Sequence, residues 1–174
     1  VDGTKALAKT LDRVLFQRAT SFIGTADMKN YTFQADVMTD GNRRIKGDMG
    51  LINQRYLISI RGNAKVMEIS SNHERIKHSV PFVVKAKTWY TIKTRVDVQA
   101  DGSGIVRGKA WVKGEPEPEA WTIEYTHKYA NTNGSPGIFG FVPQIHKRLY
   151  LTLYTFNAPD VLLFLYFFFR PIFI

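Results

Sequence analysis

TWYTIKTRVDVQADGSGIVRGKAWVKGEPEPEAWTIEY, residues 88–125, contains the clearest strand pattern in this chain. Its first part, Thr88–Val98, has apolar residues at most even positions and polar residues at most odd ones. That period of two is typical of a strand with one buried face. Asp101, Gly102 and Gly104 follow, and glycine supplies the positive φ that hairpin loops require. Because Ile105–Val112 repeats the alternation, the stretch predicts a β-hairpin.

Matching the inward faces predicts the register of this hairpin. Val98 then lies opposite Val106, and Ile92 lies opposite Val112, because a slip of one residue would bury polar side chains. The outward face gains three cross-strand pairs, Asp97–Arg107, Arg95–Lys109 and Lys93–Trp111. The sequence therefore predicts a basic outward face that carries an exposed indole.

A proline-stiffened loop and a third strand follow the hairpin. Glu115–Glu119 contains two prolines, which remove two ladder donors, so it is not a central strand. We expect Trp121, Ile123 and Tyr125 to point inward from the strand after it. Trp89 opens its strand at a polar position, and we assign it to the core as well.

The rest of the chain also reads as strands and turns. Tyr31–Met38 alternates cleanly, and Gly50–Arg61 reads as one long strand whose polar side carries Asn53 and Arg55. We predict further strands at Lys5–Lys9, Arg13–Arg18, Ala64–Ser70, Gly137–Val142 and Leu149–Phe156. Ala19–Asn30 is expected to be a loop, and Asn72–Val80 a short strand or an exposed loop. About ten strands without an amphipathic helix predict an all-β, two-sheet antiparallel sandwich of the jelly-roll type.

The size and charge of the chain narrow its function. It has 174 residues, which suits one domain, and it has no cysteine, so disulfides and thiolate metal sites are excluded. The net charge of +9 favours an acidic partner, such as an anionic polysaccharide or an anionic membrane surface. Since the cations form no dense run and no nucleic-acid motif is present, we do not expect nucleic acid to be the partner.

We divide the chain into a jelly-roll domain, residues 1–156, and an atypical hydrophobic tail, residues 157–174. Val161–Ile174 is nearly all apolar but too short for a helix that spans a bilayer, which takes roughly 20 residues. We expect an end that packs poorly, and the alternative is an anchor at a membrane surface. Because the chain starts at Val1 inside an apparent strand, we expect it to be a piece of a longer protein.

Five segments recur in this order in one bacterial group: Gly50–Tyr56, Thr88–Tyr90, Lys109–Trp111, Gly114–Glu124 and Gly134–Gly140. On these segments the chain, from about Val1 to Leu151, resembles the C-terminal domain of PQQ-binding-like β-propeller repeat proteins. More broadly it is similar to the concanavalin A-like/laminin-G-like jelly roll, a fold shared with 3-keto-disaccharide hydrolase-type domains.

The resemblance implies an extracytoplasmic setting, in the periplasm or cell envelope, with a β-propeller upstream in the same protein. The quinone-type propeller is absent from this chain, so its redox chemistry is not carried over. In that group the last strand carries an Asp-Asn pair, whereas this chain has Leu149–Tyr154 there. A cation site built on that pair is therefore not carried over, and the resemblance transfers no catalytic residue.

Catalytic and metal sites find little support in the residues. Glycoside hydrolysis needs two carboxylates across a cleft, and alternate glutamates in Glu115–Glu119 do not share a face of a polyproline segment. The four histidines lack zinc-ligand spacing. Asp40–Asn42 and Asp101 resemble calcium ligands, but turns need these residues anyway. We predict no catalytic residue, no metal site and no cofactor, and a structural calcium ion has no clear motif.

The strongest candidate site is the outward face of the central hairpin. Trp111 lies there beside Lys93, Arg95 and Lys109, and a flat ring flanked by donors is a surface that binds sugars. Asn53 and Arg55 join it if their strand belongs to the same sheet. The simpler interpretation, which we favour for this face, is a cation–π pair between Lys93 and Trp111 that stabilises the sheet.

Three functions follow from this sequence. The first is a non-catalytic module of an exported bacterial protein that binds carbohydrate or another cell-envelope ligand. The second is an enzyme domain of the 3-keto-glycoside hydrolase type. The third is a structural module that docks on the upstream β-propeller.

Overall fold

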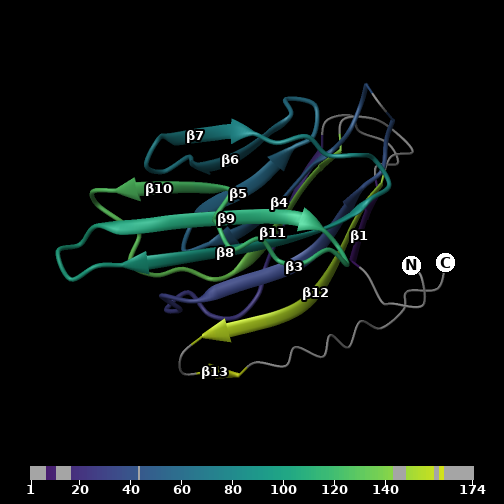
Figure 1. The fold of residues 1–174 in the computed structure, drawn as a ribbon. Helices are drawn as coiled ribbons and strands as arrows, with labels where there is room; N and C mark the ends of the chain where they lie inside the picture. The colour runs from purple at the N-terminus through teal and green to yellow at the C-terminus, as the bar shows by residue number, and fades with distance from the viewer. Residues whose placement is uncertain (1–6, 11–16, 43, 143–147, 159–160, 163–174) are drawn as a thin grey trace.

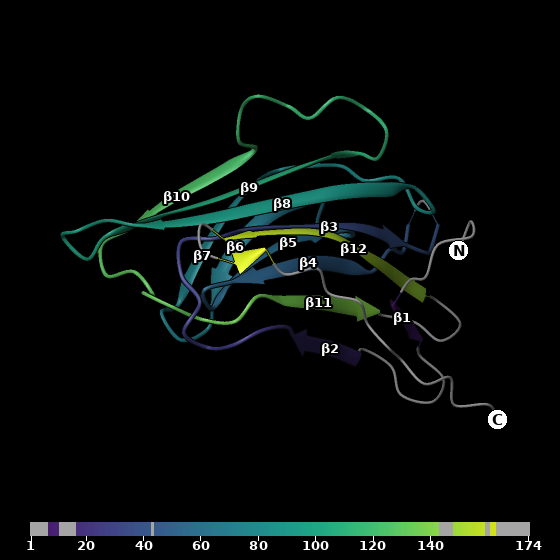
Figure 2. The same ribbon diagram turned by 90° about the horizontal axis from the view of Figure 1, so that it is seen from below.

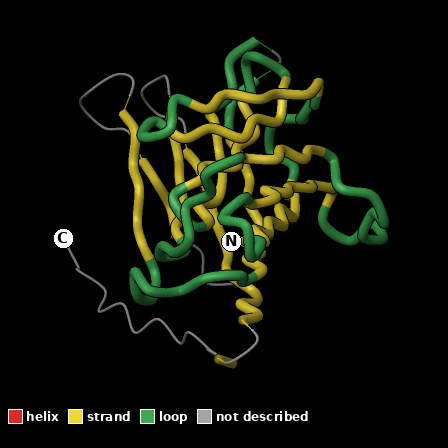
Figure 3. Tube along the Cα trace, turned by 90° about the vertical axis from the view of Figure 1, so that its left-hand side faces the viewer, coloured by secondary structure: helices red, strands yellow, loops and turns green. Residues whose placement is uncertain are grey.

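The computed structural model describes residues 7–10, 17–42, 44–142, 148–158 and 161–162 (Figure 1). Strands, turns and loops make up all of these residues, and no helix occurs among them (Figure 3). The strands form two antiparallel sheets that face each other. The predicted all-β sandwich of the jelly-roll type is therefore confirmed.

Sheet A has seven strands and sheet B has six. Sheet A runs in the order β1 (Leu7–Thr10), β12 (Arg148–Ala158), β3 (Thr32–Thr39), β8 (Trp89–Val98), β9 (Gly104–Val112) and β10 (Ile123–His127), with β13 (Val161–Leu162) paired to β12. Sheet B runs in the order β2 (Gln17–Phe22), β11 (Gly137–Val142), β4 (Asp48–Asn53), β5 (Tyr56–Arg61), β6 (Val66–Ser71) and β7 (Ile76–Pro81). Strands far apart in sequence lie side by side, as β3 does between β12 and β8.

An apolar layer between the sheets forms the core. Sheet A contributes the inward residues that alternation predicts in β3, β8 and β9, namely Phe33, Ala35, Val37, Tyr90, Ile92, Val96, Val106 and Ala110. Sheet B contributes Met49, Leu51, Tyr56, Ile58, Ile60, Met67 and Ile69. These side chains are buried, so the hydrophobic effect favours this pairing of faces over any slip by one residue.

The register of the central hairpin differs from the prediction by two residues. Val96 lies opposite Val106, and Val98 lies opposite Gly104. The reason is a shorter loop, Gln99–Ser103, which the Gln99 N–H closes by donating to the Ser103 carbonyl at 2.8 Å. Because the shift is two residues, the inward and outward sets are unchanged.

The predicted long strand Gly50–Arg61 is wrong, because it is a hairpin of β4 and β5. Gln54 and Arg55 form its two-residue turn, with φ of 47° and 70°. Two consecutive positive φ values give the type I′ turn that suits a hairpin, although glycine or asparagine is the usual residue there. The turn reverses the parity, so inward residues are odd-numbered in β4 and even-numbered in β5.

Other strand boundaries differ from the predicted ones by a few residues. β2 extends to Phe22, so the predicted loop Ala19–Asn30 is shorter than expected. The ambiguous stretch Asn72–Val80 contains a turn and then β7. Most of the predicted apolar tail lies outside the described residues. In the part of the chain that the structure describes, no helix has the length and apolar character needed to cross a membrane.

The two sheets approach each other closely at Gly108 of β9. A Cβ atom there would lie 2.6 Å from Cγ2 of Ile58 and 2.9 Å from Cε of Met67, both on sheet B. Real Cβ atoms do not come this close, so only glycine lets the two sheets meet at this spacing.

We predict that Gly108→Ala lowers the free energy of unfolding by about 1–3 kcal/mol, because the methyl group overpacks the core. Chemical denaturation followed by tryptophan fluorescence measures this. Ala100→Ser is the control, since Ala100 is exposed in the loop between β8 and β9. An unchanged midpoint in Gly108→Ala would contradict the close approach of the sheets.

Candidate functional site

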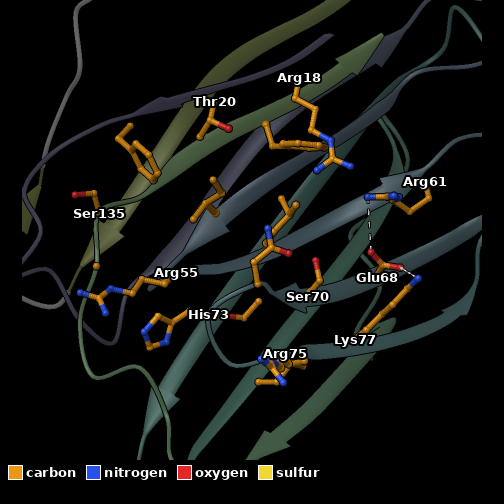
Figure 4. A pocket seen from close by; sticks show the side chains of 18 of the residues that line it. Arg18, Thr20, Arg55, Arg61, Glu68, Ser70, His73, Arg75, Lys77 and Ser135 are labelled. Atoms are coloured by element: carbon orange, nitrogen blue, oxygen red, sulfur yellow. Dashed lines mark ion pairs between the residues drawn. The ribbon is translucent and has the colours of Figure 1, made fainter. Parts of the chain in front are cut away.

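A groove of about 1000 Å³ runs over the outward face of sheet B (Figure 4). We call it the sheet B groove and define it by the side chains that line it from β2, β11, β4, β5, β6, β7 and the adjoining turns. The lining residues that matter here are Arg18, Thr20, Phe22, Ile52, Arg55, Leu57, Arg61, Glu68, Ser70, Asn72, His73, Arg75, Lys77, Ser135 and Phe139.

The strand register determines which side chains line the middle of this face. Gly50 of β4 lies opposite Ser59 of β5, and Gly137 of β11 lies opposite Ile52 of β4. All four residues point away from the core, because their neighbours Met49, Leu51, Ile58 and Ile138 point into it. Gly50 and Ser59 are buried, and the outward side chains that reach the groove here are those of Ile52 and Phe139.

Phe22 supplies an exposed aromatic ring to the groove. It ends β2, is 63% exposed and pairs with Gly137, where a Cβ would lie 2.9 Å from its ring. Phe139, two residues further along β11, also lines the groove but is largely buried. The ring of Phe22 thus offers an apolar face to a ligand beside polar neighbours.

One end of the groove holds a group of paired charges (Figure 4). Arg61 Nε lies 3.2 Å from an Asp48 carboxylate oxygen, and Arg61 Nη1 lies 3.7 Å from Glu68 Oε1. Lys77 Nζ lies 3.8 Å from the other oxygen of Glu68. Burial raises the pKa of Asp48 above its usual range, and the nearby guanidinium of Arg61 offsets part of that rise.

The other end lies where two hairpin turns come together. Arg55 belongs to the β4–β5 turn, and His73 and Arg75 belong to the β6–β7 turn. Both turns lie at the same end of sheet B, because β4, β5, β6 and β7 run antiparallel in succession. His73 Nδ1 lies 2.7 Å from the carboxylate of Glu74.

Gln54 anchors the turn that carries Arg55. Its backbone N–H donates to the hydroxyl of Tyr31 at 3.1 Å, and that hydroxyl donates to the carbonyl of Gly134 at 2.8 Å. The Gln54 side chain donates to the Asn131 carbonyl at 2.9 Å. Gln54 and Tyr31 are fully buried, and burial raises the pKa of Tyr31 above its usual range. These bonds tie the turn to the loop before β11, and so position Arg55 and Ser135 at the groove.

The predicted site residues on β8 and β9 do lie on one outward face, that of sheet A, but they are engaged in ion pairs. Arg95 and Arg107 both contact Asp97 at 2.7 Å. Lys93 donates two hydrogen bonds to the carboxylate of Glu117, at 2.6 and 2.7 Å. The register places Lys93 opposite Lys109 and not opposite Trp111, so the predicted Lys93–Trp111 pair is not a cross-strand pair.

The loop after β9 covers this face, rising over it in Figure 2. Its Glu117 pairs with Lys109 at 2.6 Å, and Lys109 also donates to the Pro118 carbonyl at 2.7 Å. Lys109 is only 6% exposed and sits 4.9 Å from the ring of Trp121. Trp111, at its place on β9, is half-buried.

Two tryptophans assigned to the core lie on this outward side instead. Trp121 is half-buried and contacts Lys109, because β10 begins only at Ile123 and Trp121 does not follow its parity. Trp89 is half-buried with Lys113 5.5 Å from its ring. Both rings stack with lysines, so they cover the sheet rather than fill the core.

Asn53 and Arg55 belong to the other sheet. Asn53 is fully buried, and its amide donates to the Tyr31 carbonyl at 3.1 Å and to the Thr94 carbonyl at 3.4 Å. Its predicted place on a polar strand face is wrong, because the turn at Gln54 reverses the parity. Arg55 is exposed at the sheet B groove. The six predicted residues therefore do not form one site.

The candidate calcium ligands are engaged within their own turns. Asp101 Oδ1 accepts from the backbone N–H of Ser103 at 2.9 Å and from its hydroxyl at 2.7 Å, which lowers the pKa of Asp101. Asn42 Oδ1 accepts from the N–H groups of Arg44 and Ile45. Among the residues described, no three histidine, aspartate or glutamate side chains are grouped to hold a metal ion.

Sequence reasoning missed the sheet B groove. Its five cations come from five different strands and turns, and the turn that exposes Arg55 carries no glycine. A signal was present in Arg75, the last residue of the β6–β7 turn, and in Lys77, the second residue of β7. Only the order of strands in sheet B brings these residues next to Arg18 and Phe22.

No protein-family model matches this chain, and no curated protein matches it. Solved structures of similar shape include the catalytic domain of a glycoside hydrolase family 131 protein from Coprinopsis cinerea, with 14% identity, a TM-score of 0.48 and 79% of this chain covered. This chain spans 60% of that structure.

Two further similar structures come from other organisms. An endo-β-1,4-glucuronan lyase from Trichoderma reesei has 10% identity and a TM-score of 0.47, with 85% of this chain and 78% of that one covered. The galectin LEC-6 from Caenorhabditis elegans has 6% identity and a TM-score of 0.41, with 83% and 95% covered.

We predict that Tyr31→Phe lowers the free energy of unfolding by about 1–3 kcal/mol, because it leaves the buried Gln54 N–H and Gly134 carbonyl without their partner. Thermal and chemical denaturation measure the loss. Tyr129→Phe is the control, since Tyr129 is 71% exposed. Equal stability of the two variants would contradict the role of Tyr31 as an anchor.

We predict that the ion pairs of Glu117 contribute to the free energy of unfolding and that this contribution is lost in acid. Hydrogen bonds from Lys109 and then Lys93 hold its pKa below the usual 4.5, so its contribution is present above that pH and is lost as the pH falls through the lowered pKa. Because Glu117 is 41% exposed, we expect Glu117→Gln to cost at most about 1 kcal/mol near neutral pH.

Denaturation of wild type and Glu117→Gln across a series of pH values measures this difference. The difference should vanish in acid, where both side chains are neutral. Glu119→Gln is the matched control, because Glu119 lies in the same exposed loop and makes no ion pair with any described residue. A difference that persists in acid would show that charge pairing is not its cause.

Proposed function

We propose that this domain is a non-catalytic binding module that holds an extended carbohydrate chain in the sheet B groove. The observation that carries the proposal is an open groove in which an exposed ring, Phe22, lies among side chains that donate hydrogen bonds. Ligand sites combine an apolar surface with a few placed polar groups in this way.

The chemistry of sugars suits these residues. The C–H face of a pyranose ring packs on the electron-rich face of an aromatic ring, which Phe22 offers. The hydroxyl groups of the sugar accept hydrogen bonds from guanidinium and amide groups, which Arg18, Arg55 and Asn72 supply around the groove. The groove crosses several strands of sheet B, so it has room for more than one sugar unit.

The acidic residues favour binding over hydrolysis. A glycoside hydrolase of the usual kind has two carboxyl groups about 5–9.5 Å apart across its cleft. Glu68 is the one carboxylate among the described residues that line the groove, and it is held by Arg61 and Lys77. An enzyme domain of the 3-keto-glycoside hydrolase type is therefore the alternative that this site supports less well.

We also propose a setting for the module, which rests on the sequence resemblance. The motif segments Gly50–Tyr56 and Gly134–Gly140 approach each other beside the groove, where a Cβ on Gly134 would lie 3.1 Å from Cα of Gln54. By that resemblance the module is the C-terminal domain of an exported bacterial PQQ-binding-like β-propeller protein, in the periplasm or cell envelope. It works without a cofactor, and docking on the propeller and membrane contact by the tail are its further proposed contacts.

Phe22→Ala tests the site. Loss of the ring should weaken binding to a polysaccharide by about two- to twelvefold, from a stacking energy of about 0.5–1.5 kcal/mol. Affinity electrophoresis against a panel of neutral and acidic polysaccharides, followed by calorimetry on the best, measures it. Phe22 is exposed, so the variant should fold as wild type does.

Trp111→Ala is the companion variant, because Trp111 lies on the outward face of sheet A with Lys93, Arg95 and Lys109. We expect it to bind as wild type does. Binding lost in Trp111→Ala and kept in Phe22→Ala would move the site to sheet A. Failure of every polysaccharide to bind would overturn the proposed function.

A further inference from the structure

The charges that line the sheet B groove are strongly unequal. Its described lining has five basic residues against the one carboxylate of Glu68; they are Arg18, Arg55, Arg61, Arg75 and Lys77. Groups of one sign in a hollow with low-dielectric walls raise the local concentration of counter-ions. A lining of this composition favours an anionic ligand over a neutral one.

Part of this charge is already neutralised within the protein. Glu68 lies between Arg61 and Lys77, and Arg61 also pairs with Asp48. These contacts fix that end of the groove as a structural group of ion pairs. The excess positive charge therefore comes from Arg18 and from the two arginines of the hairpin turns, Arg55 and Arg75.

Arg55 and Arg75 have no ion-pair partner among the described residues, and both are exposed. They come from neighbouring hairpin turns, and Figure 4 shows both at the edge of the groove, on either side of His73. A guanidinium group binds a carboxylate through two parallel hydrogen bonds. Two such groups at one end of a groove suit a ligand that carries carboxylates.

Both arginines also occupy backbone positions that suit glycine better. Arg55 has φ of 70° and Arg75 has φ of 53°, which is the left-handed region. A side chain with a Cβ is disfavoured there, so glycine would relieve the backbone at either position. Removing these side chains should therefore leave the fold intact, which makes them separable from stability.

We infer that the groove selects an anionic polysaccharide of the uronic-acid class, with Arg55 and Arg75 as the residues that bind its carboxylates. This inference rests on the proposed function, since it names the class of carbohydrate that the same groove holds. Phe22 supplies the stacking surface, and the two arginines supply the selection for acid groups.

The test compares each uronate-containing polysaccharide of a panel with the same polymer after carboxyl reduction, which keeps the linkages and removes the charge. Calorimetry on the full chain at fixed salt should show the acidic form binding about tenfold or more tightly than its reduced form. Arg55→Gly and Arg75→Gly should each reduce the ratio of the two affinities about three- to tenfold, with the melting temperature unchanged or raised.

Lys128→Gln is the matched control, because Lys128 is an exposed cation outside the groove. It should leave the preference for the acidic form unchanged. An equal loss in Lys128→Gln would overturn the inference in favour of general attraction by net charge, and so would equal binding of a single-stranded oligonucleotide.

The two proposals fail in different ways. Equal binding of the acidic and reduced polymers, weakened by Phe22→Ala, would overturn the inference and leave the carbohydrate-binding proposal standing. Binding of neither form would overturn both. An acidic preference that survives both glycine variants would overturn the assignment to Arg55 and Arg75.

Discussion

The apolar layer between the two sheets limits where every other side chain can lie. Side chains such as Val37 and Ile92 from sheet A and Ile58 and Met67 from sheet B are fully buried there, so each strand has one inward parity. Exposing the apolar side chains of that parity to water would cost roughly 25 cal/mol for each Å² of apolar surface. All residues of the opposite parity must then line one of two outward faces. The contents of those faces, and so the possible sites, follow from the core.

The two outward faces differ because a loop covers the face of sheet A, whereas the face of sheet B carries an open groove. On sheet A the loop after β9 brings Glu117 onto Lys93 and Lys109, which satisfies the cations and covers the strands. On sheet B the groove stays open and is lined by outward side chains of the strands and of the adjoining turns. The groove therefore keeps exposed donors and an exposed ring, whereas the face that carries Trp89, Trp111 and Trp121 serves stability.

Much of the fold could be read from alternation, because period two is a local property of an extended chain. Tyr31–Met38 and the inward residues of the central hairpin are confirmed for that reason. The hairpin register was wrong by two residues, because inward parity is the same after such a shift and only the loop length distinguishes the two. The turn at Gln54 and Arg55 was missed because it lacks glycine, and Gln54 is held there by partners distant in sequence.

Of the site, the sequence supplied the charge, the exposed cations and the absence of a catalytic motif. It also determined which face of most strands is buried, since that depends on neighbours two positions away. The tertiary structure alone decided that Asn53 is interior, that Trp121 covers Lys109, and that Arg55 lies in the groove with Phe22 and Arg75. The physical reason is that these outcomes depend on the order of strands in a sheet and on buried hydrogen bonds between distant segments, neither of which leaves a periodic trace in the chain.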